Sequence, residues 1–364
     1  MDRRSFMGTG TAMGLSTLLP TVSLAYSSFD PKPGGWRSFE LVTRLEILRP
    51  QGTVRAWVPV PSIESEYQRV IANSWTGNAA GARLVRDGKY GAAMLFAEWP
   101  EGERAPVIEI SSRFATRNRA QDLGEKDPAI ALDAATARFY TRATDLIPTD
   151  GMVRKTALSI VRGRKSELDK ARALYDWIVD NTFRDPKTRG CGTGDIRAML
   201  ETGNLGGKCA DLNALYVGLA RSLGLPARDV YGLRVAKSAF GYRSLGIGTE
   251  NATRAQHCRA EVFLTGLGWL PVDPADVRKV VLEERAQPTT LSDPVVPPVR
   301  EKLFGAWEMN WVAYNDAADV KLPGSDGASA SFLMYPQAET GAGRVDSLDP
   351  DGFRYRITSR ELSA

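Results

Sequence analysis

The segment from Gly203 to Leu223, GNLGGKCADLNALYVGLARSL, constrains the fold most, because a glycine-rich stretch changes into a helical pattern at a cysteine. The apolar residues that follow recur at the spacing of one face of an amphipathic helix: Leu212, Leu215, Tyr216, Leu219 and Leu223. Cys209 is therefore predicted in the first helical turn, where free backbone N–H groups and the helix dipole stabilise a thiolate. This segment alone also allows a buried structural cysteine that opens a core helix.

The histidine content supports a functional role for this cysteine. The chain of 364 residues contains one histidine, His257, and histidine is the usual base beside a cysteine nucleophile. Two apolar runs, 260–264 and 269–272, flank Gly-Leu-Gly at 266–268, which predicts a β-hairpin. His257 begins the first strand and Asp273 ends the second, so the two residues are expected to meet. The carboxylate would then hold one ring nitrogen while the other faces the thiol.

A cysteine, then a histidine on a strand, then an aspartate after the next strand resembles the transglutaminase-like superfamily of papain-type cysteine enzymes. The motifs GGKCADLNALYVGLARSLGLPAR, QHCRAEVFL and GWLPVDPAD are similar to its three core motifs, in the same order, within residues 150–285. By that resemblance Cys209 is the nucleophile, His257 the general base and acid, and Asp273 the group that orients the imidazole. The resemblance also implies an α+β fold, with a papain-like or transglutaminase core in which the cysteine helix packs on an antiparallel sheet.

Composition excludes several other classes of protein. With 43% hydrophobic and 25% charged residues the chain is globular, and it is long enough for two domains. The net charge of +4 is spread along the sequence, without a basic run or a nucleic-acid motif, so we expect no nucleic-acid partner. Gly207 and Lys208 precede a cysteine where a phosphate-binding loop has serine or threonine, so that motif is rejected.

The first 25 residues resemble a twin-arginine export signal. Arg3 and Arg4 precede Phe6 and a mildly apolar stretch that reaches Leu24. That stretch is short and rich in glycine and threonine, so no stable membrane anchor is expected after cleavage. We therefore expect a periplasmic or otherwise exported protein, whose nearest substrates are peptides or proteins of the cell envelope.

An exported protein can form disulfides, which makes Cys191 and Cys258 a candidate pair. Strand alternation alternatively places Cys258 as a free thiol on the core face with Ala260, and His257 on the opposite face. A zinc site formed by the three cysteines and His257 is disfavoured, because no C-x-x-C pair is present and strand neighbours point oppositely. No metal and no cofactor are expected.

Four segments are predicted along the chain. Residues 1–25 form the signal, 36–120 an antiparallel β-sandwich-like domain, 121–150 a linker, and 151–364 the catalytic domain, whose sheet the C-terminal strands extend. In the catalytic domain Ser166 is the expected N-cap of a helix that ends at Asn181. The tryptophans of the β-domain have strand spacing and are expected mostly in its core: Trp57, Trp75 and Trp99.

Two segments are candidate walls of a cleft. The glycine-rich stretch before Cys209 is one. The long insertion at 236–256 is the other, because loops of this length are uncommon and often bind ligands. Within it Tyr242 and Arg243 are candidate substrate contacts.

The predicted chemistry is acyl transfer through a Cys209 thioester, with the cysteine backbone N–H donating to the oxyanion. With water as acceptor the protein is a cysteine peptidase or amidase, and with an amine it is a protein-crosslinking transglutaminase. Water is the abundant acceptor outside the cell, so hydrolysis is the favoured one of these two reactions. A non-catalytic envelope binding protein on the same fold is the alternative from another class, and it would show no selective labelling of Cys209.

Overall fold

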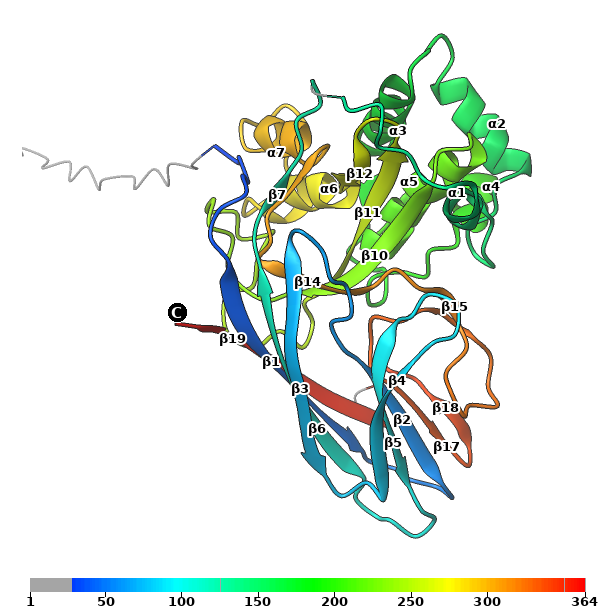
Figure 1. Cartoon of the computed structure of the whole chain (residues 1–364), viewed down its shortest axis with the longest axis vertical. Helices are drawn as coiled ribbons and strands as arrows, with labels where there is room; N and C mark the ends of the chain where they lie inside the picture. The colour runs from blue at the N-terminus through cyan, green and yellow to red at the C-terminus, as the bar shows by residue number, and fades with distance from the viewer. Residues whose placement is uncertain (1–27, 125, 350, 364) are drawn as a thin grey trace, which may run out of the picture.

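The computed structural model of this chain describes residues 28–124, 126–349 and 351–363, with a helical part at one end and a β-sandwich at the other (Figure 1). The predicted export signal at 1–25 lies outside the described residues. Among the described residues, no helix combines the length and apolarity needed to cross a bilayer.

Two antiparallel sheets form the sandwich. One has the strand order β19-β1-β6-β3 and the other β18-β17-β2-β5-β4. Alternating apolar residues such as Leu45, Leu95 and Ile108 fill the space between them. Trp57 and Trp99 are fully buried as predicted, whereas Trp75 is 37% exposed. The strands that the first part of the chain supplies are β1 (Arg37–Ile47), β2 (Val54–Pro59), β3 (Gln68–Gly77), β4 (Gly81–Arg86), β5 (Ala93–Trp99) and β6 (Val107–Thr116).

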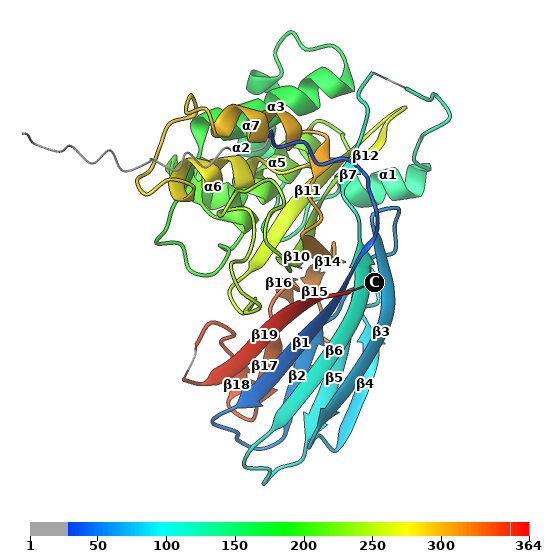
Figure 2. The same cartoon turned by 90° about the vertical axis from the view of Figure 1, so that its left-hand side faces the viewer.

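The C-terminal strands differ from the prediction. β17 (Gln337–Thr340) pairs with β2, β18 (Gly343–Val345) pairs with β17, and β19 (Phe353–Leu362) pairs with β1 along the length of both strands. Figure 2 shows β19 beside β1 in the sandwich. The expectation that the C-terminal strands extend the sheet of the helical part is confirmed for β14 (Trp311–Asn315), which pairs with β10 (Ala227–Arg234). It is wrong for β17, β18 and β19, because alternation predicts a half-buried strand without specifying its partner. Both ends of the chain build the sandwich.

The helical part contains a four-stranded antiparallel sheet, ordered β12-β11-β10-β14, with α5 packed against β11 and β10. Every residue of α5 is buried. The Ser166 hydroxyl caps α3 as predicted, accepting the Asp169 N–H at 3.0 Å. The helices are α2 (Gly151–Ile160), α3 (Glu167–Asn181), α4 (Ile196–Thr202), α5 (Cys209–Ser222), α6 (Pro274–Glu283) and α7 (Val296–Lys302), and the strands are β10 (Ala227–Arg234), β11 (Gln256–Leu264), β12 (Gly268–Val272) and β14 (Trp311–Asn315).

Short elements join these two parts. The predicted linker at 121–150 contains a helix, which Asp133 caps by accepting the N–H groups of Ala135 and Thr136. The bounds of the short elements are α1 (Ala134–Thr141), β7 (Arg119–Ala120), β8 (Phe183–Arg184), β9 (Gly206–Gly207), β13 (Ala306–Trp307), β15 (Ala318–Val320) and β16 (Ala330–Phe332).

The predicted hairpin is confirmed and positions the histidine. β11 and β12 pair from Ala260 opposite Val272 to Leu264 opposite Gly268. All of β11 is buried, on both faces. The polar side chains on one face of β11 can be buried because they have charged partners. For example, the Glu261 carboxylate accepts a hydrogen bond from Arg228 at 2.6 Å. His257 thus lies at the start of a strand that is held on every side.

Candidate active site

Cys209 lies at the first position of α5, 3% exposed, and lines a cleft of about 660 Å³. Asp211 fixes the backbone around it, accepting the N–H groups of Thr193 at 3.0 Å, Gly194 at 2.9 Å and Lys208 at 2.9 Å. Gly192 has φ +96°, and a Cβ there would meet the Asp211 carboxylate. Asp211 therefore clamps the glycine-rich segment to the helix, and this segment forms one wall of the cleft as predicted.

The Cys209 thiol lies among two other thiols and the imidazole. Hydrogen bonds from Cys191 and Cys258, followed by the contribution of His257, hold the pKa of Cys209 well below its ordinary value of 9.0 despite burial. Interaction with Cys209, together with burial, raises the pKa values of Cys191 and Cys258 well above 9.0. All three cysteines are free. Of the two alternatives for Cys258, the structure has the buried free thiol.

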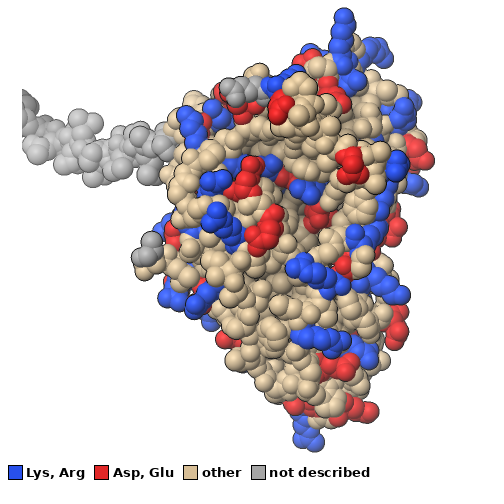
Figure 3. All heavy atoms as spheres, viewed as in Figure 1, with Lys and Arg blue, Asp and Glu red and all other residues tan. Residues whose placement is uncertain are grey.

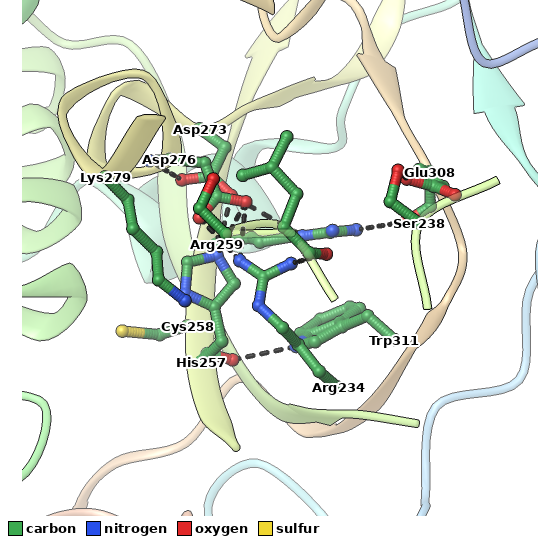
Figure 4. A network of polar contacts seen from close by, with 12 residues as sticks. Arg234, Ser238, His257, Cys258, Arg259, Asp273, Asp276, Lys279, Glu308 and Trp311 are labelled. Carbon is green, nitrogen blue, oxygen red and sulfur yellow. Dashed lines mark hydrogen bonds and ion pairs between the residues drawn. The ribbon is translucent and has the colours of Figure 1, made fainter. Parts of the chain in front are cut away.

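His257 and Asp273 are in direct contact. His257 Nε2 lies 2.7 Å from Asp273 Oδ2, which leaves Nδ1 as the ring nitrogen for Cys209 (Figure 4). Asp273 is also the N-cap of α6, because its other oxygen accepts the Asp276 N–H at 3.1 Å. The Trp311 indole donates to the His257 carbonyl at 2.8 Å. The strand, the helix cap and the indole together fix the imidazole.

Three residues of this network were not predicted from the sequence. Asp276 Oδ2 lies 3.4 Å from His257 Nε2, and Arg234 Nη2 binds both Asp276 oxygens at 2.5 and 2.7 Å. Asn213 donates to Asp273 Oδ1 at 3.3 Å and to the Cys258 carbonyl at 2.8 Å. The sequence contained a signal for the role of Asp276, because this residue stands in the same motif one helical turn after Asp273. Arg234 and Asn213 had none.

The charges of this buried network balance. Burial alone would lower the pKa of His257, but Asp276 and Asp273 outweigh it and raise the pKa from 6.5 to about 9. Burial is likewise outweighed at Asp276, where Arg234 and His257 hold the pKa well below 3.8. Arg259 Nε lies 3.5 Å from Asp273 Oδ2. Arg234 and Arg259 thus match the two aspartates, and an imidazolium at His257 matches a thiolate at Cys209.

His257, Asp273 and Asp276 also offer ligand atoms that lie within 4.8 Å of one another. Such a group has the composition of a divalent metal site. However, Asp276 already binds the Arg234 guanidinium, and Arg259 lies beside Asp273. Both arginines would repel a divalent cation at this position, so we assign Asp273 and Asp276 to ion pairs.

Tyr242 and Arg243 do not line the cleft. Tyr242 is 2% exposed and its hydroxyl donates to the Val295 carbonyl at 2.9 Å, while Arg243 donates to the Glu284 carbonyl at 2.9 Å. The geometry gives them structural contacts and no place as substrate contacts in this cleft. The insertion does form a wall, through residues that follow them: Gly246, Ile247, Gly248, Asn251, Thr253, Arg254 and Ala255.

The insertion is anchored to the sandwich. The Ala252 N–H donates to the Ile357 carbonyl at 2.9 Å, and the Ser359 N–H donates to the Glu250 carbonyl at 2.8 Å. Leu348, between β18 and β19, and Tyr355 of β19 line the cleft as well. The C-terminal strands therefore complete the site as well as the sandwich.

Comparisons with known proteins give a family match over part of this chain. The model of the transglutaminase-like superfamily matches residues 154–274. A protein from Haemophilus influenzae, named only as uncharacterized, is 36% identical over 330 residues, which are 86% of this chain and 87% of that protein.

A solved structure shares the fold. A "putative cysteine protease" from Cytophaga hutchinsonii has a TM-score of 0.51 at 14% identity, over 90% of this chain and 99% of that one. The periplasmic domain of TgpA from Pseudomonas aeruginosa has a TM-score of 0.34 at 15% identity, over 68% of this chain and 89% of that one. The likeness to the Cytophaga protein concerns the fold alone. From the three motifs and the family match, we conclude that residues 154–274 form a domain of the transglutaminase-like superfamily.

Proposed function

We propose that the protein is a thiol-dependent acyl-transfer enzyme that acts on peptide or protein amides, with Cys209, His257 and Asp273 as its catalytic residues. One observation supports this most. Asp273 holds Nε2 of the only histidine at 2.7 Å, and the pKa of the cysteine beside that histidine is held well below its ordinary value. A lowered thiol pKa, a fixed base and an adjoining cleft are the requirements of a cysteine nucleophile.

In the proposed reaction the Cys209 Sγ attacks the amide carbonyl carbon, and the electron pair of the C=O bond moves to the oxygen. The backbone N–H of Cys209 donates to that oxyanion, as expected at a helix N-terminus. His257 gives its proton to the departing amine, and a thioester remains. His257 then takes a proton from the second nucleophile, which attacks the thioester and releases Cys209.

Hydrolysis is the outcome we propose, with crosslinking as the alternative. The cleft is lined by lysines and arginines, whereas neither aspartate nor glutamate is among its lining residues. A lysine ammonium that approaches as acyl acceptor would meet like charge, whereas water would not.

Isotope incorporation would test this proposal. The enzyme is incubated with envelope protein in H₂¹⁸O together with a fluorescent primary amine, and the products are analysed by mass spectrometry. We expect ¹⁸O in new carboxyl groups, little amine incorporation, and neither product with Cys209→Ala. Amine incorporation as the main product would favour crosslinking. Equal products from Cys209→Ala would contradict thiol catalysis.

We also propose that the protein acts outside the cytoplasm, which the twin-arginine pattern at its N-terminus supports. A variant carrying Arg3→Lys and Arg4→Lys is expected to remain in the cytoplasmic fraction. Unchanged export of this variant would contradict the proposal.

A further inference from the structure

The cleft beside Cys209 carries positive charge on every wall. Its cationic side chains come from the glycine-rich segment, the insertion, α6 and β19: Arg184, Arg189, Lys208, Arg254, Lys279 and Arg354. Among the described residues that line the cleft there is neither aspartate nor glutamate. The face of the molecule in Figure 3 differs, because lysines and arginines there are interspersed with aspartates and glutamates.

Nearby carboxylates compensate this charge only in part. Asp346 pairs with Arg189 at 2.5 Å, and Glu46 pairs with Arg354. Glu283 is shared between Arg184 and Lys279, which lies 3.8 Å from it. Lys208 Nζ donates to a neutral partner, the Thr188 carbonyl, at 2.7 Å. Within the described part of the chain no carboxylate pairs with Lys208 or with the exposed Arg254. The cleft therefore holds excess positive charge beside the thiol.

Lys279 is a largely buried cation of this cleft. Burial, followed by repulsion from Arg234, lowers the pKa of Lys279 to about 8 even though Glu283 and Asp276 oppose the change. Figure 4 shows the Lys279 side chain extended alongside the His257 imidazole. An anion placed there would lie next to the reacting atoms and would relieve the repulsion.

We propose that the cleft selects an acidic peptide segment, with carboxylate side chains on both sides of the amide bond that Cys209 attacks. This inference rests on the proposed function. The cations stand on separate walls instead of converging on one point, which suits carboxylates spaced along an extended chain better than one compact anion. Complementary charge would also steer the substrate into the cleft and raise its association rate.

Matched peptides would test the selectivity. Three series share one sequence and carry glutamate, glutamine or lysine at the positions that flank the cleaved bond. We expect kcat/KM to rise about tenfold for each glutamate over glutamine, the factor for one gained charged hydrogen bond. The preference should shrink at high ionic strength, where charges are screened. Equal or lower kcat/KM for the glutamate series would overturn the inference.

A charge reversal away from the catalytic residues gives the control. Arg254→Glu should reduce the preference for glutamate peptides by about tenfold or more, because it removes one cation and adds one repelling carboxylate. The preference is the ratio of kcat/KM for glutamate peptides to kcat/KM for glutamine peptides, so a general loss of activity cancels in it. Arg162→Glu alters an equally exposed arginine that does not line the cleft, and should change neither value. Equal effects of both variants would show that only net charge matters.

Binding separates this inference from the proposed function. Fluorescence anisotropy with Cys209→Ala reports peptide affinity without turnover. If this variant prefers glutamate peptides while the wild type cleaves none, the selectivity stands and the enzyme assignment fails. If the wild type cleaves all series equally, the enzyme assignment stands and the selectivity fails.

Discussion

Replacing His257 with glutamine is expected to lower kcat/KM by about 10²- to 10⁴-fold, the usual contribution of a general acid–base. It should also end the selective alkylation of Cys209 by iodoacetamide at pH 6. Both effects share one cause, because His257 supplies a cation that lowers the pKa of Cys209 and the proton for the departing amine. The measurements are the alkylation rate between pH 4 and 10 and the kinetics of peptide cleavage.

The pH dependence has a defined sign. The pKa of His257 is raised from 6.5 to about 9, so the imidazolium persists through neutral pH and is lost as the pH rises through about 9. Wild-type kcat/KM is therefore expected to decline near pH 9, and not near pH 6.5. A decline near pH 6.5 would show that the histidine is neutral in the working enzyme.

The other two thiols provide internal controls. Cys191 and Cys258 have pKa values well above the ordinary value, so neither is expected to react at pH 6. Cys258→Ala removes a hydrogen bond to Cys209 and keeps His257, so its alkylation profile should also move toward higher pH, while the proton for the departing amine is retained. If His257→Gln left the labelling of Cys209 unchanged, the thiolate would not depend on the imidazole.

The positions of Cys209, His257 and Asp273 in the fold were predictable because each belongs to a local pattern. Cys209 stands where a glycine-rich stretch meets helical periodicity, and His257 and Asp273 stand at the two ends of one hairpin. In a hairpin the register of the two strands brings the residues at its open end into contact, so the contact can be predicted from their positions in the sequence. Arg234 was not predictable in this way. It reaches Asp276 from a neighbouring strand far away in the sequence, and an arginine that ends a strand most often faces solvent.

In the fold as well, features that depend on local sequence patterns were predictable, whereas pairings between distant segments were not. The sandwich strands and the helices α3 and α5 were visible in apolar periodicity. The partner of β19 was not, since any half-buried strand shows the same alternation. The proline-rich stretch before β13 predicts a loop, yet it contains α7, whose prolines occupy its first turn, where proline is tolerated. The pairing of the C-terminal strands with strands from the first part of the chain also places residues of the C-terminal segment in a wall of the cleft.

Replacing Asp276 with leucine is expected to destabilise the protein by about 3–5 kcal/mol, because Arg234 would remain as a buried cation without its partner. The side chains of both residues are at most 3% exposed, so water cannot solvate the remaining charge. Unfolding in urea, followed by tryptophan fluorescence, measures the loss. Asp176→Asn is the matched control, because its pair with Arg300 is partly exposed and should be worth at most about 1 kcal/mol.

A double variant separates the buried charge from the packing. Arg234→Met combined with Asp276→Leu removes both charges, and most of the stability should return. The Leu245 carbonyl, which Arg234 binds at 2.6 Å, keeps a second donor in Asn310 at 2.8 Å, so no acceptor is left unsatisfied. The double variant removes Asp276, which raises the pKa of His257, and Arg234, which lowers it by less, so the pKa should fall and the decline of kcat/KM should move below pH 9. Restored stability with an unchanged pH profile would mean that the effects of Asp276 and Arg234 on the imidazole cancel, and that Asp273 maintains its charge.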